Sequence, residues 1–478
     1  MRSRILARKA ECERLQECLD ADQAQLVIIY GRRRVGKTFL ANEFFEDQMV
    51  FRLTGAYDRP QEYQLRNFQT ELRRRSGKSQ KQPEDWQEAF DGLRSYLESL
   101  PRDEKQVVFL DELPWISGKG DDFISSFEWF WNDWASTQHH LIFVLCGSAT
   151  SWMTEHIADN KGGLFNRKTC SLFLKPFTLA ETESFLQKKN IHWSRYEIAE
   201  CYMIMGGIPY YLNLLSNRRS FVENINTLFF KEHGELWDEF DHLYRTLFTN
   251  SENYIKIVEA LSGKMSGMTR EELIAETKLP KNGVISGMLK DLVASGFVRI
   301  SRFYQQKKKG AVYQLSDYYT AFYFRFLHDQ AGRDEHFWSN GIDYPGRRAW
   351  AGLTFEQVCK DHIPQIKQKL GISGMLSDEF VWYYKGNRDL GLPGAQIDLV
   401  LERRDRVIHL CEMKFSVNEY VIDRTYDQSL RNKMDAFRRE TKTRKTLLLT
   451  MITTYGVVLN QYSYMAQSQI VLDDLFAF

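Results

Sequence analysis

Three short runs of apolar residues in the first third of the chain predict the strands of a buried sheet. They are Leu26 to Tyr30, Val107 to Leu110, and the run that begins at Leu141. Their aliphatic, β-branched composition is typical of strands covered on both faces, as in the parallel sheet of an α/β protein. Phe39, Leu40 and Phe44 follow the first run at helical spacing, so we expect a strand, a turn and then a helix.

The pattern changes near Asn250. Residues 251–300 contain three stretches with Ile, Leu and Met at helical spacing, and two short strands follow, "FVRISRF" and "AVYQLSD", joined by the basic loop "YQQKKKG". Farther on, Ile397 to Leu401 and Val407 to Cys411 are apolar runs on either side of the polar turn "ERRDR". This arrangement predicts a β-hairpin. A basic helix and then a strand are expected in "DRTYDQSLRNKMDAFRRETKTRKTLLLT".

The turn after the first strand has the spacing of a phosphate-binding loop, Gly-x-x-x-x-Gly-Lys-Thr. Small residues let consecutive backbone N–H groups surround a polyphosphate, and the start of the helix adds its positive end. We therefore expect ATP at this turn, with Lys37 on the β- and γ-phosphates and Thr38 on Mg²⁺. The predicted loop consists of Gly31, Arg32, Arg33, Arg34, Val35, Gly36, Lys37 and Thr38.

Acidic residues follow the second strand, in "QVVFLDELPW". Asp111 falls at the carboxyl end of the strand, where a parallel sheet presents side chains to a ligand, and is expected to hold the magnesium through water. Glu112 is the candidate general base that polarises the attacking water. Ser148, at the end of the third strand, is a candidate sensor of the γ-phosphate, although strands often end in such Gly-Ser turns.

The composition fits a multidomain protein. Its net charge is too small to attract nucleic acid to the chain as a whole. The chain has 478 residues, 43% hydrophobic and 14% aromatic, and a formal net charge of +1. Nucleic-acid contact must therefore come from local patches. The seven cysteines form no Cys-x-x-Cys pair, which argues for reduced thiols and against structural zinc. Because no signal peptide or long apolar run is recognised, we expect cytoplasmic residence and no membrane partner.

The motifs "GRRRVGKT", "VVFLDELPW", "LIFVLCGSATSWM" and "GGIPYYL" resemble the archaeal-type ATPase family, a STAND branch of the AAA+ class of P-loop ATPases. The resemblance covers about the first half of the chain. It implies slow, switch-like ATP hydrolysis and a helical lid that contains "GGIPYYL" and closes over the nucleotide. It also makes Arg167, in "GGLFNRKT", the nearest candidate for a charge-stabilising arginine finger. A homo-oligomer is a candidate assembly.

Three helices followed by a strand pair are the order of a winged helix. In a DNA complex, the helix from Gly283 to Ala294 would enter the groove with Lys290 facing out. The wing lysines Lys307, Lys308 and Lys309 would contact phosphate. Winged helices serve as often for domain docking, so both roles stay open.

The predicted hairpin carries a second set of catalytic residue types. Asp398 lies on its first strand, and Glu412 and Lys414 share one face at the end of the second. Two carboxylates could hold a divalent metal, Mg²⁺ or Mn²⁺, while the lysine activates water for attack on a phosphodiester of DNA or RNA. The hairpin resembles the core of PD-(D/E)XK nucleases. Its first helix would then be "WAGLTFEQVCKDHI", with Glu356 as a further metal ligand.

The sequence thus predicts four domains: a P-loop ATPase (1–180), a helical lid (181–248), a winged helix (249–330) and a PD-(D/E)XK-like α/β domain (345–478). Two functional classes remain. The first is an ATP-driven nucleic-acid enzyme, favoured by the intact Asp398, Glu412 and Lys414. The second is a nucleotide-dependent switch or scaffold whose nuclease-like domain only binds DNA or protein, which the near-neutral net charge favours.

Overall fold

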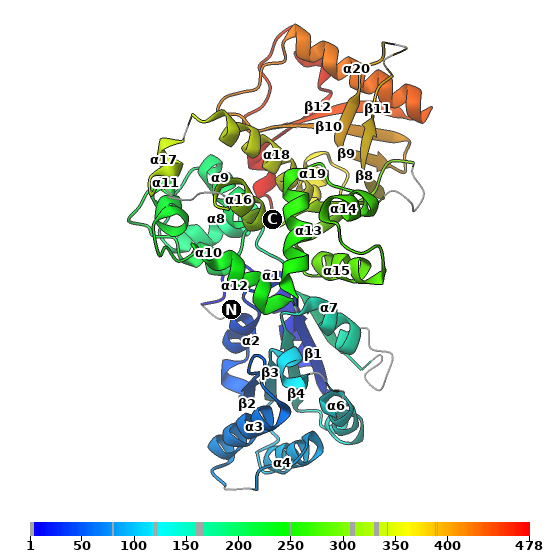
Figure 1. The fold of residues 1–478 in the computed structure, drawn as a ribbon. Coiled ribbons are helices and arrows are strands. Elements are labelled where there is room, and N and C mark those ends of the chain that lie inside the picture. Colours follow the sequence, from blue (N-terminus) through cyan, green and yellow to red (C-terminus); the bar gives the residue numbers. More distant parts are fainter. Residues whose placement is uncertain are drawn as a thin grey trace. The chain divides into compact units, whose positions relative to one another are not determined.

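The structure is a computed structural model of the chain. It describes residues 4–78, 81–118, 120, 122–158, 167–248, 250–305, 311–328, 334–341, 343–387, 389 and 391–478. The chain divides into two compact units, residues 1–176 and 177–478 (Figure 1). No helix in the described ranges combines the length and apolar character that a membrane crossing requires.

The first unit is built around a five-stranded parallel sheet with the order β2-β3-β4-β1-β5. The three apolar runs predicted from the sequence form its central strands β1, β3 and β4. The strands are β1 (Gln25–Tyr30), β2 (Met49–Thr54), β3 (Gln106–Asp111), β4 (Leu141–Gly147) and β5 (Cys170–Phe173). The helices are α1 (Lys9–Asp20), α2 (Lys37–Phe44), η1 (Glu46–Gln48), α3 (Gln61–Ser76), α4 (Trp86–Glu98), α5 (Leu113–Ser117), α6 (Asp122–Asp133), η2 (Ala135–Thr137), α7 (Thr150–Met153) and η3 (Thr154–Ala158).

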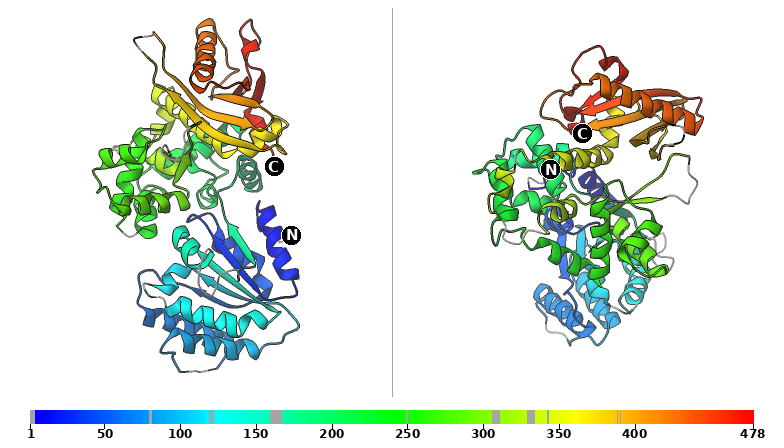
Figure 2. Two further views of the ribbon diagram at one scale, coloured as in Figure 1. Left: turned by 90° about the vertical axis from the view of Figure 1, so that its right-hand side faces the viewer. Right: turned by 45° about the horizontal axis from the view of Figure 1, so that its top comes forward.

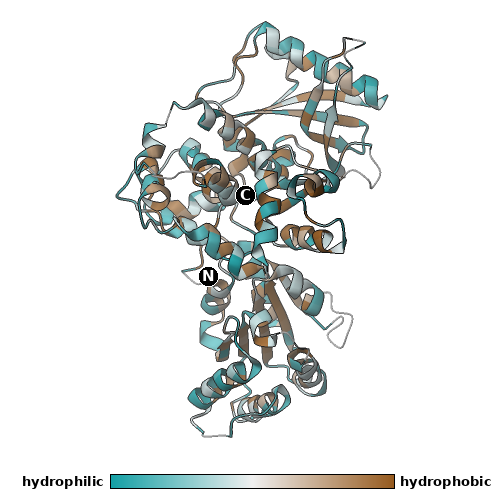
Figure 3. Ribbon diagram, in the orientation of Figure 1, coloured by the Kyte–Doolittle hydropathy of each residue, from teal (hydrophilic) through white to brown (hydrophobic). Residues whose placement is uncertain are grey.

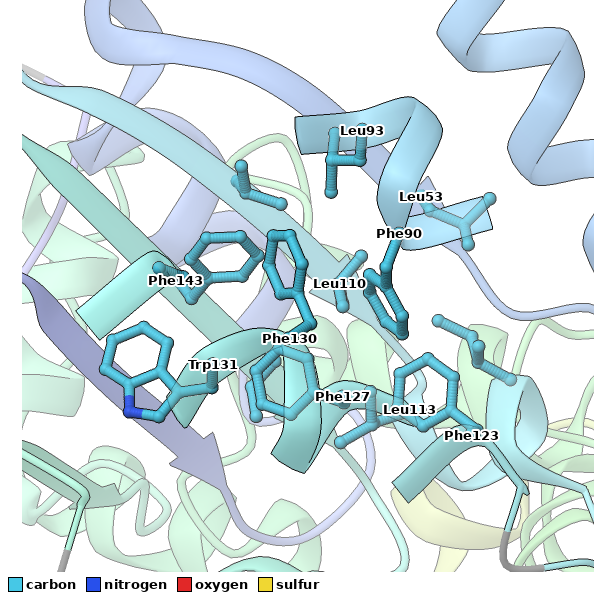
Figure 4. Close-up of a cluster of buried hydrophobic side chains, with 14 of the residues drawn as sticks. Leu53, Phe90, Leu93, Leu110, Leu113, Phe123, Phe127, Phe130, Trp131 and Phe143 are labelled. Carbon is cyan, nitrogen blue, oxygen red and sulfur yellow. The ribbon is translucent and has the colours of Figure 1, made fainter. Parts of the chain in front are cut away.

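An aromatic core joins one face of this sheet to α3, α4 and α6, which Figure 2 shows in blue and cyan. Phe90 of α4 stacks on Phe130 of α6 with ring centroids 5.0 Å apart, and Phe127 and Phe130 also contact Phe143 of β4 (Figure 4). The strands themselves are strongly apolar (Figure 3). Burial on both faces explains why they read as continuous hydrophobic runs. Because the strands are all parallel, the motifs predicted to bind ATP lie at one carboxyl edge of the sheet.

The second unit begins with helices in the region predicted as a lid. Three of the helices in residues 177–225 begin with a capping box, at Thr178, Ser194 and Ser220. The helices of the lid region are α8 (Leu179–Lys188), α9 (Arg195–Met205), α10 (Pro209–Asn213), α11 (Phe221–Ile225), η4 (Asn226–Phe230) and α12 (Glu239–Leu247).

Three helices and a strand pair follow in the predicted order. They are α13 (Ser251–Gly263), α14 (Arg270–Thr277), α15 (Gly283–Ala294), β6 (Val298–Ser301) and β7 (Val312–Leu315). The two strands pair antiparallel, and Met268 adds a bridge to Tyr313. Lys290 is exposed on α15, as expected, whereas the wing lysines 307–309 lie outside the described residues. The helices α16 (Tyr318–Phe326) and α17 (Phe337–Asn340) come next.

The C-terminal part contains a five-stranded mixed sheet with the order β12-β11-β10-β9-β8. The predicted hairpin is confirmed, because β9 and β10 pair antiparallel. The strands are β8 (Ser377–Tyr384), β9 (Ala395–Arg403), β10 (Val407–Lys414), β11 (Thr446–Thr453) and β12 (Ser468–Val471). The helices are α18 (Pro345–Asp361), α19 (Ile363–Lys369), α20 (Arg424–Thr441), η5 (Ser463–Met465) and η6 (Leu472–Phe476). Helix α20 packs its apolar face on the sheet (Figure 1).

Candidate functional site

The phosphate loop lies between β1 and α2, at the carboxyl edge of the first sheet. Gly31 has φ +144°, and a Cβ there would come within 2.5 Å of the carbonyl oxygen of Leu174, so this position requires glycine. Gly36 caps α2 with φ +90°. The ammonium of Lys37 donates to the carbonyl oxygens of Gly31 (2.9 Å) and Arg32 (2.8 Å). Burial lowers the pKa of Lys37, so its charge is poorly solvated and available to a phosphate.

Thr38 and Asp111 lie side by side at the start of α2 and the end of β3. The Thr38 hydroxyl donates to the Asp111 carboxylate at 3.0 and 3.2 Å. Burial raises the pKa of Asp111, and the charge of Glu112 raises it further. A hydroxyl next to a buried carboxylate is the donor set that a magnesium ion on a nucleotide uses, so the two residues fit Mg²⁺.

Glu112 and Ser148 are also brought together, from the ends of β3 and β4. The Ser148 hydroxyl donates to Glu112 Oε1 at 2.7 Å, and the Ser148 amide donates to Oε2 at 3.3 Å. Glu112 has a left-handed backbone with φ 50°, uncommon for a residue with a side chain. The structure therefore holds the carboxylate through a strained turn and a polar partner, an arrangement often found at functional sites.

Two residues near this site were not identified from the sequence. Arg8, which is 5% exposed, donates to the carbonyl oxygen of Val35 at 3.1 Å and so supports the phosphate loop from the start of α1. Burial raises the pKa of the Cys146 thiol on β4, and the nearby carboxylate of Asp111 raises it further. An isolated arginine and a strand cysteine carry no spacing signal, so only the fold reveals them.

Arg167 is not brought to the phosphate loop of its own chain. It is exposed, and it precedes β5 by three residues. Cys170 pairs with Val27, and β5 runs parallel to β1, so Arg167 lies toward the amino edge of the sheet. The phosphate loop follows the carboxyl end of β1, roughly 20 Å away at the usual rise of a strand.

The C-terminal cluster of Glu356, Asp398, Glu412 and Lys414 comes from α18, β9 and β10. The paired register of the hairpin ends where Cys411 is opposite Leu399, so Glu412 and Asp398 are the next residues beyond this last pair. Lys414 contacts Glu412 with 3.1 Å between Nζ and Oε1, which agrees with their predicted common face. Gln396 donates to Asp398 at 2.6 Å.

The charges in this cluster are unevenly compensated. Burial raises the pKa of Glu356 to about 8, and the nearby carboxylate of Asp398 adds to the effect. Glu412 has the opposite behaviour, with its pKa lowered: burial acts to raise it, but Lys414 and Lys433 outweigh this. Lys433 donates to Glu412 Oε2 and Tyr426 donates to Oε1, both at 2.7 Å.

These carboxylates fit a divalent cation only in part. Within the described residues, no three or more His, Cys, Asp or Glu side chains are gathered as a set of metal ligands. Glu356 and Asp398, both half-buried, repel one another, and a cation would relieve this repulsion. Both oxygens of Glu412 already accept hydrogen bonds, so Glu412 would have to exchange Lys433 or Tyr426 for a metal.

The comparison with protein families bears on the first of these two sites. Residues 6–215 match a family model described as an ATPase domain predominantly from Archaea. The match supports an archaeal-type P-loop ATPase. The matched region contains the phosphate loop, Asp111, Glu112 and Ser148, and it extends beyond Pro176 into the helices α8 to α10. ATPase activity with a nucleotide and Mg²⁺ is what this family implies.

Three similar proteins illustrate the range of the resemblance. An uncharacterized protein of Methanocaldococcus jannaschii is 25% identical over 420 residues, which cover 85% of this chain and 87% of the other. An uncharacterized ATP-binding protein of the same organism is 47% identical over 45 residues, 9% of this chain and 76% of that protein. The structure of a Walker-type ATPase of Pyrococcus abyssi has a TM-score of 0.49 and 19% identity, and covers 68% of this chain and 97% of its own.

Proposed function

We propose that this chain is an ATP-hydrolysing protein of the AAA+/STAND class whose nucleotide state acts on a C-terminal, metal-dependent nuclease-like domain. The observation that supports the second part is the convergence of Glu356, Asp398, Glu412 and Lys414 from three elements of the C-terminal domain. Acidic residues and a lysine close together on a mixed sheet suit water attack on a phosphodiester.

In the ATPase part, each residue has a distinct task. Lys37 exchanges its loop carbonyls for the β- and γ-phosphates, and Thr38 and Asp111 hold the magnesium. Glu112 accepts a proton from the attacking water. Ser148, which donates to Glu112, links that base to the end of the neighbouring strand, so a change at the γ-phosphate reaches both residues.

Arg167 can serve as an arginine finger only for a neighbouring subunit, because it lies far from the phosphate loop of its own chain. This role requires a homo-oligomer. The Arg167→Ala variant should then retain ATP binding and lose hydrolysis. Mixing it with a Lys37→Ala variant should restore some hydrolysis, because mixed interfaces pair an intact loop with an intact arginine. If Arg167→Ala hydrolyses ATP at the rate of the unmodified chain, Arg167 is not an arginine finger.

In the nuclease-like part, Glu356 and Asp398 would hold a divalent metal, Mg²⁺ or Mn²⁺, with Glu412 as a third ligand once it releases Lys433. The metal would supply Lewis-acid stabilisation of the phosphodiester. Lys414 is half-buried beside Glu412, and its ammonium would orient the attacking water. The substrate class is DNA or RNA.

A second candidate function is a nucleotide-dependent switch or scaffold whose nuclease-like domain only binds. The observation in its favour is the saturation of Glu412 by Lys433, Tyr426 and Lys414. A carboxylate with this many donors behaves as a structural anion and has little need of a metal.

Plasmid nicking by the full chain with Mg²⁺ or Mn²⁺, with and without ATP, separates the two functions. Asp398→Asn should abolish nicking, whereas Asp378→Asn is the matched control, because Asp378 is a half-exposed carboxylate on the neighbouring strand β8. Nicking that survives at the unmodified rate in Asp398→Asn would contradict a catalytic role for Asp398. No nicking by the unmodified chain in either metal would favour the scaffold.

A further inference from the structure

The segment predicted as a winged helix is joined to the nuclease-like sheet by backbone pairing. Beyond β6, the Arg302 carbonyl accepts a hydrogen bond from the Val381 amide at 2.9 Å, and the Tyr304 amide donates to the Val381 carbonyl at 3.0 Å. Phe303 forms a parallel bridge with Val381 of β8. The chain after β6 therefore extends the edge of the C-terminal sheet.

Tyr304 strengthens this connection. Its ring belongs to the core beneath α20, 5.1 Å from the ring of Phe437 and 5.4 Å from that of Phe380. Its hydroxyl donates to Glu402 at 2.8 Å. Because the core and the backbone pairing both hold the segment, the position of β6 relative to β9 is fixed.

This arrangement brings a cation from β6 to the carboxylates of the nuclease-like domain. Two neighbouring cavities share Arg299 of β6, Lys360 of α18 and Asp398 of β9. Glu356 lines the first cavity, one helical turn before Lys360. On the side of the winged-helix segment, the first cavity is lined by Met265, Ser266, Gln314, Leu315 and Ser316.

Arg299 and Lys360 can each bind a further anion. Arg299 forms an ion pair with Asp361, which also accepts from the Tyr318 hydroxyl at 2.5 Å. A guanidinium has five N–H donors, so this pair leaves others for a ligand. Lys360 lies close to Asp398 and Glu356, which act to raise its pKa against the effect of burial.

We propose that Arg299 and Lys360 bind a phosphodiester group of a nucleic-acid strand next to a divalent metal held by Glu356 and Asp398. The inference rests on the proposed nuclease-like function, and it adds residues from outside the hairpin. Without metal, the Asp398 carboxylate lies near Lys360 and repels a phosphate. A divalent ion would neutralise this carboxylate, so that Lys360 and the N–H donors of Arg299 not used by Asp361 could bind the phosphate. Strand binding should therefore depend on the metal.

Fluorescence anisotropy of a short, labelled single-stranded DNA on the full chain tests this, with Ca²⁺ or EDTA at one ionic strength. Ca²⁺ is an oxygen-ligand cation, so it can occupy carboxylates, and the fixed salt matters because phosphate contacts are salt-dependent. Arg299→Gln and Lys360→Gln should each lose about 10-fold in the Ca²⁺-dependent affinity, since charge-assisted hydrogen bonds are the strong ones.

Matched controls are Arg348→Gln and Lys369→Gln. Arg348 of α18 pairs with Asp343, and Lys369 of α19 pairs with Asp474. None of these four residues lines the two cavities. Their affinity should stay within about twofold of the unmodified chain. Arg299→Lys keeps a charge beside Asp361 and should retain part of the affinity, so it separates loss of the ligand contact from loss of folding.

Two results would overturn the proposal: wild-type affinity of Arg299→Gln and Lys360→Gln in Ca²⁺, or an equal loss in Ca²⁺ and EDTA. If the unmodified chain binds Mn²⁺ in calorimetry while the variants bind DNA normally, only this inference fails. If the variants lose Ca²⁺-dependent binding but no nicking is ever seen, the inference stands and the cleavage activity falls. An unmodified chain that neither binds Mn²⁺ nor nicks refutes both.

Discussion

Replacing Glu356 by Gln should make the C-terminal sheet more stable at neutral pH in the absence of metal. Burial raises the pKa of Glu356 from 4.5 to about 8, the Asp398 carboxylate adds to this, and Lys360 opposes it. The ionised form is therefore the unfavourable one in the folded chain. Glutamine has nearly the same shape and no charge, so Glu356→Gln removes the cost of ionisation while it retains the packing of α18.

The sign and size follow from proton linkage. Between the unfolded pKa of 4.5 and the folded pKa of about 8, the folded chain binds more protons at Glu356 than the unfolded chain does. The contribution of Glu356 to the free energy of unfolding therefore falls as the pH rises through that range, and it levels off above it. Between about pH 5.5 and about pH 7.5, the free energy of unfolding of the unmodified chain should fall by about 2 kcal/mol relative to that of Glu356→Gln.

Native-state hydrogen exchange of the amides in β9 and β10 measures this difference locally, in EDTA, because it reads the opening free energy of that sheet. The comparison of variant and unmodified chain at each pH cancels the intrinsic dependence of exchange on pH. Lys360 must be considered as well, since it is close to Glu356 and Asp398. Its pKa is lowered by burial, so a change in its protonation adds its own slope, which Lys360→Gln would remove.

A flat difference between Glu356→Gln and the unmodified chain from about pH 5.5 to about pH 7.5 would refute the reasoning, because it would mean that Glu356 ionises normally. The opposite slope would show that a cation outweighs burial at Glu356. Either result would also weaken the case that Glu356 and Asp398 share a metal.

Further predictions concern the ATPase site. Lys37→Ala should abolish ATP binding in a titration and leave the circular dichroism spectrum unchanged, because a desolvated ammonium adds little to folding stability; normal affinity would be contrary evidence. Glu112→Gln should keep ATP bound and stop phosphate release, since an amide accepts no proton from water. Arg8→Ala should weaken ATP binding by about 1–3 kcal/mol through loss of the contact to the Val35 carbonyl, measured by calorimetry.

The grouping of the residues predicted to bind ATP was largely predictable, because they lie in two short motifs that directly follow doubly buried strands. The Gly-x-x-x-x-Gly-Lys-Thr spacing places Lys37 and Thr38 on one turn, and the end of a parallel strand places Asp111 opposite them. The sequence could not predict that Arg8 supports the phosphate loop. Arg8 lies far from the loop along the chain, and its contact depends on how α1 packs. The distance of Arg167 from the loop likewise depends on the direction of β5.

In the C-terminal part, alternation along the hairpin was enough to put Glu412 and Lys414 on one face. The basic helix was harder to interpret, because a charge on a helix does not reveal its partner. Lys433 donates to Glu412, and Arg431 pairs with Asp427 one turn away. The partners come from tertiary packing of α20 on the sheet, and spacing within the helix carries no such information.

The joint between the winged-helix segment and the C-terminal sheet has a consequence for how the chain works. The sequence placed a boundary between 330 and 345, yet Tyr304 lies in the core of the following domain and the chain after β6 lengthens its sheet. A strand that supplies both backbone hydrogen bonds and a core aromatic cannot move independently of that sheet without exposing it. Any motion of this part of the chain should therefore carry β6 and β9 together, with Arg299 and Asp398 still lining the same cavities.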